Sequence, residues 1–184
     1  MKLRFALLAV LLIAGCATET RHPVSGPPLT AVTEDEAQAL LNDLRLDLED
    51  VSTRQIGGDA LEPRVANRTL QLELKPAALF EEGNAQLRVE ALEPLAEIAG
   101  DIAARGGCVV HVVAFGADEA TIDLAERRAA SLADNFAHHA VAPSRVRFES
   151  RVDDKLADRI VIALRPVIIG REPPAWVPPA IDRP

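Results

Sequence analysis

Residues 108–136 constrain the fold most, because they have the pattern of a buried strand, a short turn and an amphipathic helix in direct succession. The run CVVHVVAF at 108–115 is apolar and rich in β-branched residues, and it lies between Gly107 and Gly116. Such a run is typical of a strand that is packed on at least one face. Residues 116–119 are the expected turn, and a helix is predicted from about Thr121. We therefore expect the domain to be organised around this strand, turn and helix.

The predicted helix carries one arginine on its apolar side. At 100° per residue, Arg128 falls inside the apolar arc, whereas Arg127 falls outside it, toward solvent. The arc is formed by Leu124, Ala125, Ala129, Leu132 and Phe136. Because an unpaired buried charge is very costly, Arg128 needs a partner. The nearest candidate is Asp118 in the preceding turn, or else an anionic ligand that both residues contact, so this pair is our candidate functional site.

Composition limits the classes of function that this chain can have. Its 184 residues leave room for one domain with a leader, a linker and a tail, and the formal net charge is −8. Without a leader that contains Lys2 and Arg4, the chain has 18 basic and 28 acidic residues, a net charge of −10. A chain this acidic, with no basic cluster, is a poor ligand for nucleic acid or anionic lipid.

The first fifteen residues have the pattern of a signal peptide. The positively charged start is followed by an apolar run at 5–13, which is far shorter than the ~20 residues needed to cross a bilayer. The sequence IAGC at 13–16 resembles the lipobox of bacterial lipoproteins. That resemblance implies cleavage before Cys16 and acylation of Cys16. Because Ala17, and not Asp, follows the cysteine, it implies no signal for retention in the inner membrane and favours the outer membrane. The alternative is an ordinary secretory leader with a coincidental cysteine.

Four regions are expected: a signal peptide at 1–15, a tether at 16–68, a folded domain at 69–167 and a Pro-rich tail at 168–184. Within the tether, Thr33 and Glu36 have capping-box spacing and open a helix near 33–50. This helix could pack on the domain, bind a partner or stay exposed to solvent.

The domain pattern alternates strands and helices. Alternation at 69–74 predicts a half-buried strand, residues 80–84 a loop, and the pattern at 85–104 a helix that contains Pro94 and ends at two glycines. One apolar stripe of that helix is formed by Leu92, Leu95, Ala99 and Ile102. Further strands are predicted at 145–149 and 159–164. The order β-α-β-α-β-β implies an α+β two-layer sandwich, with a mixed sheet and both helices on one face.

This order of segments resembles the OmpA-like domain of bacterial envelope proteins, over residues 70–167. The segments that carry the resemblance are LF…GNA at 79–85, LEPLAEIA at 92–99, VVAFGADE at 112–119, LAERRA at 124–129, VAPSRV at 141–146 and DRIVI at 158–162. The resemblance implies noncovalent binding of peptidoglycan through the diaminopimelate of its stem peptide, with Asp118 and Arg128 at the family's ligand positions. Asp118 would accept from the ammonium of diaminopimelate, and Arg128 would hold its carboxylate with paired donors.

The sequence also departs from the family pattern. The interval between Asp118 and Arg128 is shorter and lacks the Gly, Tyr and Asn found there, the final loop is reduced to 150–156, and Asp158 replaces an Asn. Two functions therefore stay open: a lipoprotein that links the outer membrane to the cell wall, or a degenerate copy of the domain that serves as a periplasmic interaction or assembly lipoprotein with envelope proteins as partners. Structural roles also stay open, Asp118 as a helix N-cap and Arg128 in an internal ion pair or reaching water.

The remaining reactive residues favour structural roles. Cys108 is expected to be a small buried strand residue, with an intermolecular disulfide as the alternative. His111 is expected in the core or on a sheet face, and His138 and His139 at the end of a helix, where they complement its dipole. The sequence contains no metal-ligand pattern, no nucleophile paired with a base and no Gly-rich phosphate loop, so we expect no enzyme activity, no cofactor and no metal.

Overall fold

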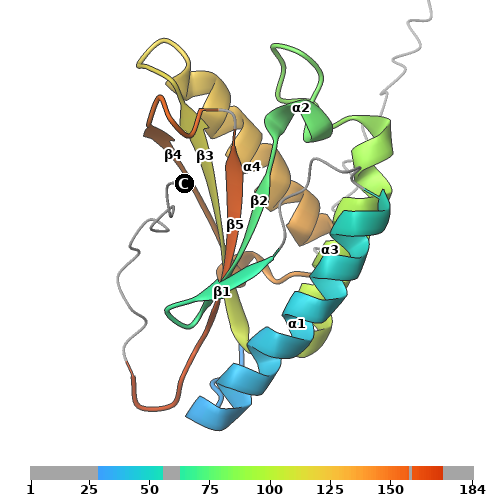
Figure 1. Cartoon of the computed structure of the whole chain (residues 1–184), viewed down its shortest axis with the longest axis vertical. Coiled ribbons are helices and arrows are strands. Elements are labelled where there is room, and N and C mark those ends of the chain that lie inside the picture. Colours follow the sequence, from blue (N-terminus) through green and yellow to red (C-terminus); the bar gives the residue numbers. More distant parts are fainter. Residues whose placement is uncertain (1–28, 56–62, 158, 172–184) are drawn as a thin grey trace, which may run out of the picture.

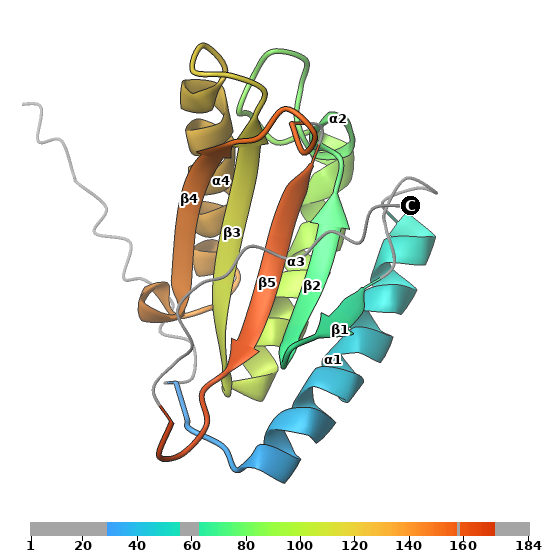
Figure 2. The ribbon, with the colours of Figure 1, turned by 60° about the vertical axis from the view of Figure 1, so that its left-hand side comes forward.

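The computed structural model describes residues 29–55, 63–157 and 159–171. The predicted signal peptide, Cys16, most of the tether and the tail beyond residue 171 therefore lie outside the described residues. In the described part, helices α1 (Glu34–Gln55), α3 (Val89–Arg105) and α4 (Ile122–His138) lie on one face of a five-stranded sheet (Figure 1, Figure 2). The predicted α+β two-layer sandwich is thus confirmed.

The sheet is mixed, with one parallel pair at its edge. Its strands are β1 (Arg64–Ala66), β2 (Thr69–Leu74), β3 (Cys108–Gly116), β4 (Val146–Val152) and β5 (Ile160–Pro166), in the spatial order β1-β2-β5-β3-β4. Strand β5 is antiparallel to both β2 and β3, whereas β3 and β4 are parallel and joined through α4. The last strand therefore enters the middle of the sheet, and β4 is left at one edge.

Strand β1 is not predicted by the sequence, which places residues 63–67 in the tether. It forms a hairpin with β2, in which Arg64 lies opposite Gln71. The two turn residues Asn67 and Arg68 have φ angles of 48° and 58°. Two consecutive left-handed residues are typical of the two-residue turn that suits the twist of a hairpin. A strand of three residues is too short to show alternation, so the turn was its only signal.

The core lies between the sheet and the helices. Strands β2, β3 and β5 direct alternate side chains toward the helices, among them Leu72, Val112 and Ile162, all at most 1% exposed. Helix α3 faces them with Ala91, Leu95, Ile98, Ala99 and Ile102. Leu92, which we had placed on that stripe, is 42% exposed, so this prediction was wrong. At 100° per residue Leu92 lies at the margin of the observed arc, and Ala91 takes the inward position.

Helix α1 packs on its own domain, which decides among the three alternatives for the predicted helix near 33–50. Its Leu41, Leu44 and Leu48 are at most 1% exposed and join the main core. The predicted capping box is present: the Thr33 N–H donates to Glu36 Oε2 at 2.8 Å, and the Glu36 N–H donates to Thr33 Oγ1 at 3.4 Å. The helix runs further than predicted, to Gln55.

The described chain enters the fold at one end of the sheet. Val32 accepts from the Ile169 N–H at 2.9 Å and donates to the Val167 carbonyl at 2.8 Å, so the first and last described segments lie side by side. The opposite end carries the short helix α2 (Pro76–Leu79), the loop from α2 to α3 and the turn from β3 to α4 (Figure 1). Over the part of the chain that the structure describes, no helix combines the length and apolar character needed to span a bilayer.

Candidate functional site

Arg128 lies where the sequence places it, on the side of α4 that is partly covered by protein. Its Nε donates to the Asn84 carbonyl at 2.9 Å, and its guanidinium lies 5.5 Å from the centre of the Phe80 ring. Burial lowers the pKa of this guanidinium. Arg127, by contrast, is exposed and donates to the Asp123 carbonyl of its own helix. The interpretation of the helical arc is therefore confirmed for both arginines.

The loop before α3 is shaped to receive Arg128. The Asn84 side-chain Oδ1 accepts from the backbone N–H groups of Ala85 at 2.7 Å and Gln86 at 3.2 Å, which folds the loop into a tight turn. Ser131, one helical turn beyond Arg128, donates to the Ala85 carbonyl at 2.8 Å. Two side chains of α4 thus hold consecutive carbonyls of this loop, and they fix it against the helix.

A charged hollow of about 530 Å³ opens beside Arg128. Three cationic side chains, two carboxylates and an apolar floor surround it. Its lining residues are Lys75, Pro76, Ala77, Phe80, Glu81, Glu82, Gly83, Arg88, Arg128 and Ala157. Among the described residues, Arg128 makes one hydrogen bond, through Nε, so its two terminal nitrogens remain available to a ligand. Such a hollow can hold a small zwitterion, with the carboxylate on Arg128.

Asp118 takes part in the turn that leads into α4. Its Oδ1 accepts from the Thr121 N–H at 3.0 Å and from Thr121 Oγ1 at 2.9 Å, and the Asp118 N–H donates to Thr121 Oγ1 at 3.1 Å. These bonds close the turn before the helix. The N-cap of α4 is Thr121, so the alternative of Asp118 as the helix N-cap was wrong. Gly116 allows the turn to be this tight, because a Cβ there would lie 3.1 Å from the Ile122 nitrogen.

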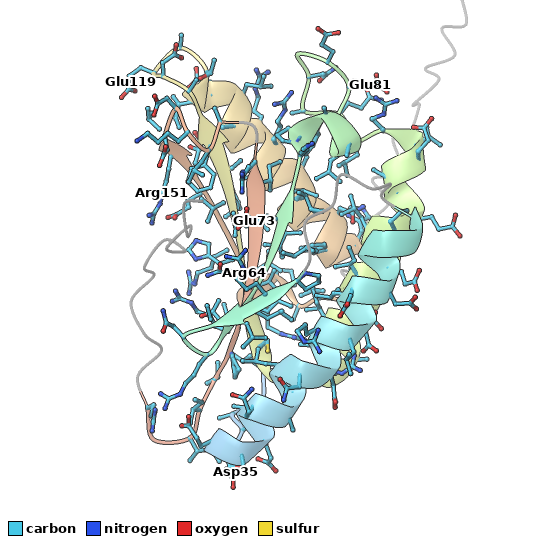
Figure 3. All side chains as sticks on the ribbon, in the orientation of Figure 1. Asp35, Arg64, Glu73, Glu81, Glu119 and Arg151 are labelled. Atoms are coloured by element: carbon cyan, nitrogen blue, oxygen red, sulfur yellow. The ribbon has the colours of Figure 1, made fainter. Side chains whose placement is uncertain are left out.

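The structure does not bring Asp118 and Arg128 into contact. No hydrogen bond or ion pair joins them among the described residues, and Asp118 is absent from the lining of the hollow. Thr121 and Arg128 are seven residues apart on the helix, a rise of roughly 10 Å. The two loops involved do lie at the same end of the fold, as the labelled Glu81 and Glu119 show (Figure 3). The assignment of Asp118 to the ligand therefore stays a prediction.

Several residues of this region were missed in the sequence. Phe80 and residues 81–84 were predicted only as a loop, although the family resemblance included Phe80 and Asn84. In the structure Phe80 is 1% exposed, and α3 begins at Val89 rather than near 85. No local periodicity marks a single aromatic residue that contacts a helix more than forty positions later, so the resemblance was the only signal available.

Arg145 was also misassigned. The predicted strand 145–149 is observed as β4, Val146–Val152, so the final loop begins at 153 rather than at the predicted 150. Arg145 precedes the strand in a 3-10 turn and is 0% exposed. It donates from Nε to the Cys108 carbonyl at 3.0 Å and from a terminal nitrogen to the Ile102 carbonyl at 2.9 Å. An alternating pattern cannot distinguish such a residue from a strand residue.

The other candidates behave as buried or surface groups. Cys108 is 2% exposed, and burial raises the pKa of its thiol to about 12, which confirms the expected small buried strand residue. His111 lies on the sheet face away from the helices, where burial lowers its pKa although Glu149 lies 3.8 Å away. Residues 29–55, 63–157 and 159–171 contain no cluster of three or more His, Cys, Asp or Glu that could hold a metal ion.

Comparison with known proteins shows which structures share this fold. No protein-family model and no curated protein sequence matches the chain. Among solved structures, a MotB-like protein from Desulfovibrio vulgaris is 12% identical, with a TM-score of 0.60 over 72% of this chain and 94% of that one. The cell wall anchor of the T6SS from Pseudomonas aeruginosa is 19% identical, with a TM-score of 0.55 over 66% of this chain and 99% of that one.

A third structure agrees. The periplasmic domain of Helicobacter pylori MotB is 17% identical, with a TM-score of 0.54 over 62% of this chain and 83% of that one. At such low identity the similarity shows the fold alone. It confirms the predicted OmpA-like fold, in a sequence that has diverged far from these proteins.

Proposed function

We propose that this chain, an OmpA-like fold in a divergent sequence, is a lipid-anchored protein of the outer membrane whose domain binds peptidoglycan noncovalently on the periplasmic side. The observation that carries the proposal is the state of Arg128: oriented by Asn84 and Phe80, partly desolvated, and with both terminal nitrogens open to a charged hollow. A protein with a similar fold, the anchor from Pseudomonas aeruginosa, is itself a cell wall anchor.

The chemistry of the hollow suits the free end of diaminopimelate, which carries an ammonium beside a carboxylate. The terminal nitrogens of Arg128 can donate in parallel to the carboxylate, and their orientation is set before the ligand arrives. Glu81 and Glu82 line the same hollow and can accept from the ammonium. Asp118, which the family resemblance assigns to the ammonium, has one oxygen engaged by Thr121 and its other oxygen available. No enzymatic step is required, because binding alone forms the link.

The position of the hollow also supports a linking role. The described chain begins beside Val167 and Gly106, at one end of the fold, and the hollow lies at the other end. In Figure 3 these ends are marked by Asp35, near the start of α1, and by Glu81. Twelve residues lie between Cys16 and Leu29, so this connection can span at most about 45 Å. If Cys16 is acylated, the anchor enters at the end opposite the hollow, so the hollow can face the cell wall.

The test is sedimentation of the chain with purified sacculi, comparing Arg128→Gln with Arg127→Gln. Both variants remove one charge from the same helix, but only Arg128 borders the hollow. We expect Arg128→Gln to weaken binding at least about tenfold, because a charge-assisted hydrogen bond is worth about 1.5–3 kcal/mol. Arg127→Gln should bind as the wild type does. Free diaminopimelate should compete for the site, whereas lysine, which lacks the second carboxylate, should not.

Two outcomes would contradict the proposal: no sedimentation of the wild type, or equal binding by Arg128→Gln. Labelling with palmitate tests the anchor separately, since the label should appear in the wild type and be lost in Cys16→Ser. A labelled chain that does not bind sacculi would leave the second function suggested by the sequence, an interaction or assembly lipoprotein without peptidoglycan binding.

A further inference from the structure

Strand β4 lies at the edge of the sheet and exposes apolar side chains. Among the described residues it pairs only with β3, so its outer edge has no neighbouring strand. Phe148 and Val152 are each 47% exposed on this strand. Exposed edges of this kind pair readily with another strand unless charges, prolines or bulges prevent it. In β4 the charges alternate with the apolar residues, and their order decides which partner strand fits.

The backbone groups that face outward can be identified from one hydrogen bond. The Asp153 N–H donates to the Gly116 carbonyl of β3 at 2.9 Å. In a parallel pair, alternate residues direct both backbone groups to the same neighbour, so residues 147, 149, 151 and 153 face β3. Phe148, Ser150 and Val152 therefore direct their N–H and C=O groups outward. None of these three residues has a described partner for those groups.

We propose that the partner is a second copy of this chain, whose β4 pairs antiparallel with this one about a two-fold axis at Ser150. In this register the outward groups of Ser150 bond to those of Ser150 in the second copy. Phe148 then lies opposite Val152, so each exposed apolar residue is covered by another. Glu149 lies opposite Arg151, with which it also pairs within its own chain at 2.7 Å. Arg147 lies opposite Asp153, the first residue after the strand, so each charge faces its opposite. The two sheets become one continuous sheet.

Other registers fit less well. An antiparallel pair requires outward-facing residues to lie opposite one another. This excludes every register in which such a residue lies opposite one that faces β3. An axis at Glu149 is allowed by the backbone, but it places Arg147 opposite Arg151 and Glu149 opposite itself, and like charges directly opposite are destabilising. An axis at Phe148 leaves Val152 opposite Ser144, beyond the end of the strand. Only the axis at Ser150 satisfies the backbone, both apolar residues and the charges.

The helix layer beside β4 has a hollow that side chains of the second copy can enter. Phe148 lines a shallow hollow of about 630 Å³ together with Asp123, Glu126, Arg127 and Ala130 of α4. This hollow lies on the same side of the sheet as Phe148 and Val152, where side chains of the second copy would meet α4. The proposal goes beyond peptidoglycan binding, because this edge is formed without any residue that lines the hollow at Arg128.

The test uses the full chain with its leader processed, in detergent, and the variant Ser150→Pro. Proline removes one N–H, and at position 150 that N–H points away from β3, where an edge strand tolerates proline. We expect the wild type to be a dimer by light scattering at about 100 µM, and Ser150→Pro to be a monomer with unchanged circular dichroism. A monomeric wild type, or a variant that stays dimeric, would overturn the proposal.

A second variant keeps the test decisive if the proline variant fails to fold. Ser150→Cys places two thiols opposite each other on the axis, so mild oxidation should give a covalent dimer. Val89→Cys, at a position 79% exposed on α3, is the matched control and should stay monomeric. The native Cys108 does not interfere, because it is buried and burial raises the pKa of its thiol to about 12. Equal cross-linking of the two variants, or none in Ser150→Cys, would also reject this pairing.

Discussion

The two ends of the sheet each hold a desolvated arginine, and the two arginines have different partners. Arg145, where β3 begins, is 0% exposed and donates to the carbonyls of Ile102 and Cys108. Arg128, at the other end, is partly exposed and has one carbonyl and one aromatic ring as partners. Burial lowers the pKa of both guanidinium groups. The degree of burial alone therefore does not reveal which arginine binds a ligand, but the partners do.

The two carbonyls that accept from Arg145 lie on either side of the junction of α3 and β3. Ile102 belongs to the last turn of α3, near the negative end of the helix dipole. Gly106, with a φ of 63°, ends the helix, and Arg145 supplies a donor from another part of the chain. Arg145 is therefore a capping residue for the junction of α3 and β3. Arg128 instead donates to a loop and keeps donors for a ligand.

The largest effect that this comparison predicts is on stability. Arg145→Met should lower the free energy of unfolding by about 3 kcal/mol, because two buried carbonyls lose their donor at about 1–3 kcal/mol each while the apolar chain restores part of the packing. Urea unfolding measures the loss. Alkylation of Cys108 reports the same opening locally, because a buried thiol with a pKa of about 12 reacts at neutral pH only when this end of the fold opens.

The control for that prediction is Arg147→Met, two residues along the chain. Arg147 is exposed on the sheet, so this variant should change the free energy of unfolding by less than about 0.5 kcal/mol. If the two variants are equally stable, Arg145 does not cap the junction, and its burial has no structural role of the kind inferred here.

A smaller effect is expected at Asp118, where the comparison is between a turn residue and a ligand residue. Asp118→Ala should cost about 1 kcal/mol of stability, because the Thr121 N–H and hydroxyl lose a hydrogen-bond acceptor in the turn before α4. Asp118→Asn keeps a side-chain acceptor and should be nearly as stable as the wild type. It removes the charge, however, so sedimentation with sacculi then separates the two roles. Unchanged binding by a stable Asp118→Asn would leave Asp118 with a role in the turn alone.

The sequence predicted those features that depend on neighbours in the chain. The strand and helix at 108–136, the Thr33–Glu36 cap and the end of α3 at two glycines follow from local patterns, and all three are present. Leu92 and the start of α3 were less accurate, because periodicity does not fix where a helix begins or which residue lies at the margin of its buried arc.

The candidate site was predictable only in part, for a related reason. Arg128 could be found because its position on an apolar arc is a local property of the helix. Its partners Asn84 and Phe80 come from a loop 44 and 48 positions earlier, and only the packing of α3 against α4 brings them together. Arg145 was missed because its role depends on Ile102 and Cys108, whose carbonyls carry no side-chain signal in a sequence.

The smallest effect expected is the change in stability of Arg128→Gln, and it tests the comparison most directly. The substitution removes one hydrogen bond to Asn84, worth about 1 kcal/mol, but it also relieves the desolvation of a partly buried charge, so the free energy of unfolding should change by less than about 0.5 kcal/mol. Urea unfolding beside Arg145→Met gives the measurement. A decrease in the free energy of unfolding as large as that of Arg145→Met would mean that both arginines stabilise the fold. A residue whose main role is to bind a ligand contributes little to stability when the ligand is absent. A near-zero change, with weaker sedimentation on sacculi, would instead assign the two arginines to different tasks.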